Sequence, residues 1–235
     1  MNARAQRWPM VAGMAFGVLT VVGIFTQFSG LPDYDGDKDS DTAIAQKVHS
    51  ALASSGDRMA VIVGAYVLFV AAVALICFAL GLRGRLLAHA PDRTVAASLV
   101  GGAGLLGGIA LAFGGALNAL VPGAIAFGGD PVPAASSADS IRFLTQLGTP
   151  MLLLVFPLAM AVLAAAVSVC ALQGVGLPRW LGYAGWLAVL GGVFGTLFLP
   201  IGLVVLWALV VGALGLRADS AGPAAIASVG AAVPG

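Results

Sequence analysis

Long apolar segments alternate with short polar ones along the whole chain. A helix needs about 20 apolar residues to cross roughly 30 Å of hydrocarbon. Six segments meet or approach this length: 9–28, 59–82, 95–121, 146–172, 180–199 and 201–216. The pattern predicts an all-α fold, a polytopic transmembrane helical bundle of six spans, with residues 1–217 as a single domain.

The last two of these spans are parts of one apolar run, residues 180–216. At 1.5 Å per residue this run is far too long for one crossing. Pro200 lies near its middle, which favours two spans joined by a tight turn, although the second of them is short. One broken helix over the same residues stays an alternative.

The longest polar segment before the second span, residues 29–58, has a helical pattern of its own. Asp41 is a plausible N-cap, and Ile44, Val48 and Leu52 then fall on one helical face. This spacing predicts a short amphipathic helix lying on the outer leaflet. The third span is expected to stop at Pro122, and the Pro/Gly-rich tail, 218–235, is expected to be a disordered cytoplasmic segment.

Composition places these helices in lipid. The chain is 60% hydrophobic and only 9% charged, with a mean hydropathy of +1.03, whereas soluble domains carry about a quarter charged residues. The first apolar segment is too long for a signal peptide and no small-residue cleavage site follows it, so it is expected to remain as a span. A net charge of +1 indicates no nucleic-acid partner. The abundance of Ala, Gly and Arg is typical of a GC-rich bacterial genome.

The distribution of charge predicts the orientation. With six spans, one side of the membrane receives seven arginines and two aspartates, and the other receives four cations and eight aspartates. Cytoplasmic loops carry the excess of Lys and Arg. The sequence therefore predicts a multi-pass protein of the bacterial plasma membrane with both termini cytoplasmic, the inner arginines being Arg4, Arg7, Arg83, Arg85, Arg93, Arg179 and Arg217.

An aspartate at every second position marks the outer segment DYDGDKDSD. An EF-hand loop needs Gly at position 6 and Glu at position 12. Counted from Asp33, these positions hold Lys38 and Ile44, and the frame that starts at Asp35 fails as well. A solvated loop is the favoured interpretation, and a weak divalent-ion site is the alternative, with the candidate ligands Asp33, Asp35, Asp37, Asp39 and Asp41. No cofactor is predicted, because neither His49 nor His89 has a second ligand near it in sequence.

No charged residue or histidine lies well inside any predicted span. Intramembrane charge usually marks proton relays and ion paths, and catalysis by acids, bases or nucleophiles would need such groups. The chain has no P-loop, no H-E-x-x-H and no G-x-S-x-G. The sequence therefore predicts that the protein is not an enzyme and not a proton-coupled pump.

Glycine and uncharged polar residues are the features that the spans do contain. Three G-x-x-x-G pairs permit close helix contact, either within the bundle, which is favoured, or in a homodimer: Gly13 with Gly17, Gly104 with Gly108, and Gly191 with Gly195. Polar side chains gather in the outer part of the spans, next to the proline-interrupted fourth span. They are either a small outward-facing ligand pocket or residues that meet interfacial water, which the pattern favours: Gln27, Tyr66, Asn118, Gln146, Thr149 and Thr196.

Three stretches carry a family resemblance: YVLFVAAVALICFALGLRGRL, LPRWLGYAGWLAVLGG and LVVLWALVVGALGLR. In their order along residues 43–217, the chain resembles the bacterial integral membrane proteins of the DUF4386 type. The aspartate run and the nearly loopless turn at Pro200 depart from that pattern. The resemblance implies a helical membrane protein and carries over no functional residues.

Two functions fit these observations. The first is a non-enzymatic accessory or scaffold component in the lipid bilayer, with a membrane protein partner or a homodimer. The alternative is a carrier or receptor for a neutral or lipophilic small molecule with an outward-facing pocket.

Overall fold

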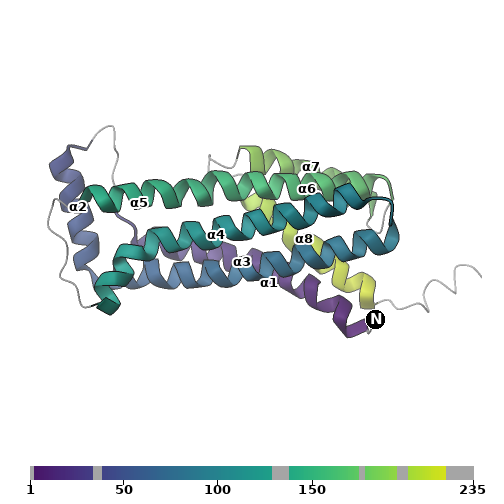
Figure 1. Ribbon diagram of the computed structural model, residues 1–235, viewed down its shortest axis with the longest axis horizontal. Helices are drawn as coiled ribbons and strands as arrows, with labels where there is room; N and C mark the ends of the chain where they lie inside the picture. Colours follow the sequence, from purple (N-terminus) through teal and green to yellow (C-terminus); the bar gives the residue numbers. More distant parts are fainter. Residues whose placement is uncertain (1–2, 34–38, 129–137, 175–177, 195–200, 221–235) are drawn as a thin grey trace, which may run out of the picture.

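The computed structural model describes residues 3–33, 39–128, 138–174, 178–194 and 201–220, and these residues form helices and their connections. The helices are α1 (Ala3–Gly30), α2 (Asp41–Ala53), α3 (Ser55–His89), α4 (Thr94–Gly128), α5 (Ala138–Pro150), the π-helix η2 (Met151–Val155), α6 (Phe156–Leu172), α7 (Arg179–Val193) and α8 (Ile201–Ser220). In Figure 1, α3, α4 and the rod made by α5 and α6 lie side by side along the long axis, and α2 crosses one end.

Four helices in the described part of the chain are long and apolar enough to cross a membrane, not the six that the sequence predicted. They are Trp8–Gly30, Ser55–His89, Thr94–Gly128 and Ile141–Leu172, and they contain the first four predicted spans. The predicted fifth and sixth spans correspond to α7, which has 15 residues, and to the shorter apolar helix Gly202–Leu214. Each is only about 20 Å long at 1.5 Å per residue, short of roughly 30 Å of hydrocarbon.

α7 and α8 flank only one half of the bundle (Figure 1). At one end of α7, a Cβ placed on Gly182 would lie 2.7 Å from Leu172, the last residue of α6. At the other end, a Cβ on Gly192 would lie 2.5 Å from the carbonyl oxygen of Pro157, near the middle of the α5–α6 rod. α7 therefore ends at mid-depth. α8 packs on the first half of α1, where a Cβ on Gly17 would lie 2.5 Å from Leu209.

The helices extend further than the apolar pattern predicted. Pro122, expected to end the third span, lies inside α4, which continues to Gly128. A proline removes one helical hydrogen bond, here to the carbonyl of Asn118, without forcing the helix to stop. α8 likewise runs to Ser220, so residues 218–220 of the expected disordered tail are helical. The remainder of that tail, 221–235, lies outside the described residues.

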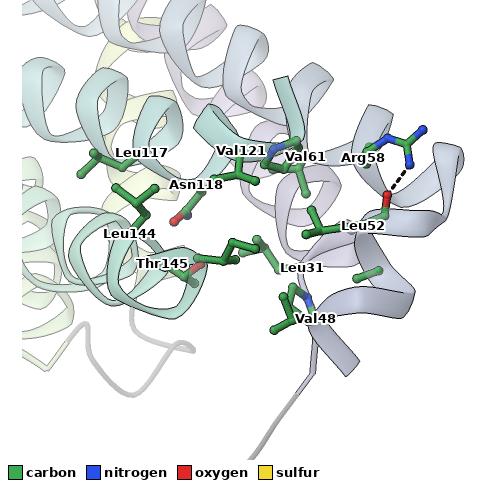
Figure 2. A pocket seen from close by; sticks show the side chains of 15 residues that line it. Leu31, Val48, Leu52, Arg58, Val61, Leu117, Asn118, Val121, Leu144 and Thr145 are labelled. Atoms are coloured by element: carbon green, nitrogen blue, oxygen red, sulfur yellow. Dashed lines mark hydrogen bonds between the residues drawn. The ribbon is translucent and has the colours of Figure 1, made fainter. Parts of the chain in front are cut away.

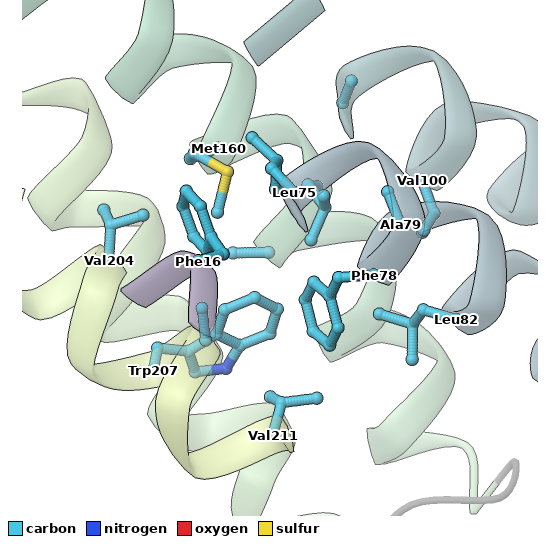
Figure 3. Close-up of a cluster of buried hydrophobic side chains, with 14 of the residues drawn as sticks. Phe16, Leu75, Phe78, Ala79, Leu82, Val100, Met160, Val204, Trp207 and Val211 are labelled. Atoms are coloured by element: carbon cyan, nitrogen blue, oxygen red, sulfur yellow. The ribbon is translucent and has the colours of Figure 1, made fainter. Parts of the chain in front are cut away.

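Aromatic and branched side chains fill the centre of the bundle. The rings of Phe16 and Phe156 pack edge to face with their centroids 6.1 Å apart, and both side chains are fully buried. Figure 3 shows Phe16 and Phe78 beside Trp207 of α8. A T-shaped aromatic contact adds about 0.5–1.5 kcal/mol to the area it buries, so this cluster ties α1, α3, α6 and α8 together.

The glycine pairs expected at helix contacts meet helices of the same chain. A Cβ on Gly13 would lie 2.5 Å from the Phe78 ring, and one on Gly108 would lie 2.8 Å from Ile76. Gly17 faces Leu209, and Gly104 lies directly against the Ala79 methyl. Gly191 is buried, and Gly195 lies outside the described residues. The described glycines therefore bring helices of one bundle together.

α2 has the predicted apolar face, with Ile44, Val48 and Leu52 buried. Its N-cap is Ser40 and not Asp41, because the Ser40 hydroxyl accepts a bond from the Ala43 N–H at 3.3 Å. These side chains form a small cluster with Ile141 of α5, separate from the main core. The predicted amphipathic helix thus lies against the end of the bundle (Figure 1).

Candidate functional site

The structure brings two of the six predicted polar site residues together. Gln27 is fully buried and Asn118 is 4% exposed, both inside the bundle. Tyr66 lies on the outer surface of the bundle with 66% of its area exposed. Gln146 is exposed and Thr149 half-buried. Thr196 lies outside the described residues.

A short chain of hydrogen bonds joins α1 to α4. Gln27 Nε2 donates to the carbonyl oxygen of Gly115 at 2.9 Å, which leaves its amide oxygen facing Asn118. Asn118 Nδ2 donates to that oxygen, Gln27 Oε1, at 3.4 Å. The orientation of both amides follows from this network, since a reversed Asn118 would set two oxygens against each other.

The same network leaves Asn118 Oδ1 without a partner in the described part of the chain, although the atom is buried. It points toward α5 (Figure 2). There it meets the bare backbone of Gly148, where a Cβ would collide with it. A buried acceptor without a hydrogen bond costs about 1–3 kcal/mol, so this oxygen would gain from a donor.

A cavity of about 20 Å³ lies beneath α2, with Asn118 in its wall. Figure 2 shows Val121 of α4, Leu144 and Thr145 of α5, and Leu52 of α2 around it. This volume has room for about one water molecule. The space is therefore nearly closed while α2 lies in this position.

Arg58 lines the same cavity from the start of α3. Its Nη1 donates to the carbonyl of Leu52 and, at 3.1 Å, to that of Ala53. These are terminal carbonyls of α2, where a cation also interacts favourably with the helix dipole. Arg58 Nε is buried and has no partner among the described residues.

The acidic run is only partly within the described residues, since 34–38, with Asp35 and Asp37, lie outside them. Asp33 is exposed. Asp39 forms an ion pair with Lys47 at 2.7 Å, and Asp41 lies 4.0 Å from Arg142. No group of three or more His, Cys, Asp or Glu side chains that could hold a metal ion occurs in the described part of the chain.

Sequence reasoning did not assign Arg58, Gly148 or Thr145 to the site. Arg58 was counted only as an outer charge, although its position directly after a short amphipathic helix was a signal that it could cap that helix. Two other buried polar atoms without described partners, Thr20 Oγ1 and Trp207 Nε1, belong to residues that do not line the cavity.

Comparisons with models of known protein families, with curated proteins and with solved structures find no match to this chain.

Proposed function

We propose that this chain is a non-enzymatic, multi-pass protein of the bacterial plasma membrane that binds a small molecule from the outer side, as a receptor or carrier. The observation that carries the proposal is Asn118 Oδ1, a buried acceptor without a described partner, on a residue that lines a cavity under α2. A ligand that donates to this oxygen would remove the cost of leaving it unpaired.

The proposed orientation has both termini in the cytoplasm, with four spans and a half-depth hairpin. Arg83, Arg85 and Arg93 follow the C-terminal end of α3, away from α2, and support a cytoplasmic location for that end. α7 starts beside the end of α6, and α8 runs back along α1 toward its N-terminal half. A hairpin that returns to the same side leaves the predicted locations of the termini unchanged.

Cysteine labelling tests this topology in a chain whose Cys77 and Cys170 are replaced by alanine. We expect Thr42→Cys, on α2, to react with an impermeant maleimide in intact cells, and Asp92→Cys to react only after permeabilisation. Gly202→Cys, at the start of α8, should resist labelling in both conditions because it lies at mid-depth. Reaction of Gly202→Cys in intact cells would instead support six spans.

Native mass spectrometry of protein extracted with its own lipid tests ligand binding. We expect one added small-molecule mass on the wild type, reduced at least about tenfold in Asn118→Leu if one buried hydrogen bond holds the molecule. Tyr66→Phe is the control, since Tyr66 lies outside the cavity. A bound mass that survives Asn118→Leu unchanged would contradict the proposal.

A second candidate function is the accessory component that the sequence also suggested. A groove of about 590 Å³ opens between α3 and α4, lined on α4 by Ala112, Ala116, Ala119 and Gly123. Small residues let a second helix approach closely. A photo-reactive residue in place of Tyr66, which borders the groove, would then cross-link one defined membrane protein, and cross-links to lipid alone would exclude this docking site.

A further inference from the structure

The cavity beneath α2 presents an unpaired acceptor at one end and an unpaired donor at the other. We infer that it binds an amphipathic molecule with a hydrogen-bond donor at its inner end, an apolar body, and an anionic acceptor at its outer end. This inference rests on the proposed function and names the class of ligand for that site.

The inner end of the cavity is an acceptor. Asn118 Oδ1 is buried and has no described partner. The backbone carbonyl of the same residue lacks its usual helical donor, because the residue four positions later is Pro122. A hydroxyl or N–H group on the ligand suits this end, whereas a second acceptor would be repelled.

The outer end is a donor with a permanent positive charge. The Arg58 guanidinium stays protonated at any physiological pH, and its buried Nε–H has no described partner. Among the described residues, the ion pairs do not include Arg58. Its Nη1 is already used by the α2 carbonyls, so a carboxylate could bind at Nε without breaking the cap of α2.

The two ends are separated by an apolar wall. Gln27, which bonds Asn118, packs its backbone against Gly64 of α3. Arg58 precedes Gly64 by six residues on that helix, which corresponds to about 9 Å along the axis. Val48, Leu52, Val61 and Val121 line the space between them (Figure 2). A chain of about eight carbons spans this distance.

Entry of such a molecule requires α2 to move, since the present volume of about 20 Å³ holds only one water molecule. α2 joins α3 through a single residue, Ser54, which is the C-cap of one helix and the N-cap of the other. Its attachment to the bundle is the small cluster of Ile44, Val48 and Leu52 with Ile141. This helix is the lid of the site.

The test uses three probes against the full chain in lipid nanodiscs: 8-hydroxyoctanoate, which has both ends, octanoate, which lacks the inner donor, and 1-octanol, which lacks the charge. Titration calorimetry is corrected with empty nanodiscs. We expect 8-hydroxyoctanoate to bind about tenfold more tightly than octanoate, since its hydroxyl pairs a buried acceptor. The Asn118→Leu variant should bind both acids equally.

Arg58→Gln should weaken both acids relative to 1-octanol, and Lys47→Gln, which removes an exposed charge from α2, is the matched control. If Asn118→Leu does not fold, the double variant Gln27→Leu/Asn118→Leu replaces it, because that variant leaves neither amide unpaired.

Equal binding of the two acids to the wild type, no saturable binding of either, or an unchanged preference in the Asn118 variant would overturn the inference. An Asn118-dependent mass of another chemical class in the native spectrum would leave the proposed function intact and reject this ligand class.

Discussion

Gly64→Ala is expected to lower the free energy of unfolding of the bundle by about 2–3 kcal/mol, the upper range for overpacking a closed interior. A Cβ on Gly64 would lie 2.6 Å from the backbone nitrogen of Gln27 and 2.7 Å from its Cα. Backbone atoms in a long helix cannot rotate away as a side chain can, so α1 and α3 must separate. The bond from Gln27 to Gly115 would be strained as well.

Gly84→Ala is the matched control, because both glycines lie on α3 and a Cβ on Gly84 meets nothing within 4 Å. Gly84→Ala should leave stability unchanged or raise it by up to about 1 kcal/mol through helix propensity. Reversible unfolding in mixed micelles, followed by circular dichroism, measures both variants. Equal stabilities for the two would mean that α1 and α3 do not approach closely at Gly64.

Gln27→Leu is expected to destabilise the bundle by about 1–3 kcal/mol, because it leaves buried polar groups without partners. The leucine cannot donate to the Gly115 carbonyl, and it removes the acceptor of Asn118 Nδ2. The side-chain amide of Asn118 then has no described hydrogen bond at either atom. Lipid and apolar side chains offer no replacement.

The double variant Gln27→Leu/Asn118→Leu separates a pairwise bond from general damage. The double variant should be more stable than the sum of the two single changes predicts, by about 0.6–1.7 kcal/mol, the coupling seen for hydrogen bonds between membrane helices. The same unfolding measurement supplies all four corners of the cycle. Strict additivity would mean that the 3.4 Å contact contributes no coupling energy.

The sequence predicted the first four spans well because their signal is local. Apolar runs of twenty or more residues specify helices in lipid whatever the other helices do. The face of α2 followed for the same reason, since Ile44, Val48 and Leu52 recur at helical spacing and are buried. The apolar run 180–216 was misread as two full spans. Its length and Pro200 were visible, but the depth at which α7 ends depends on its contact with Pro157 of α6.

The candidate site was only partly predictable. Depth along each span grouped Gln27 with Asn118, and also with Gln146 and Tyr66, which face outward. Depth does not tell which side of a nearly uniformly apolar helix faces inward. Arg58 was invisible as a site residue because its role depends on α2 folding back over the bundle.

The sequence by itself determined that this is a helical membrane-embedded chain, where its four long apolar helices lie, and that one short helix is amphipathic. Those properties depend on the composition and period of contiguous residues. Only the tertiary structure decided that Gln27 meets Asn118 across 91 positions, and that glycines such as Gly64 set the distance between helices. It also placed Arg58 and Asn118 around one cavity, because contacts between distant segments depend on how whole helices rotate and pack.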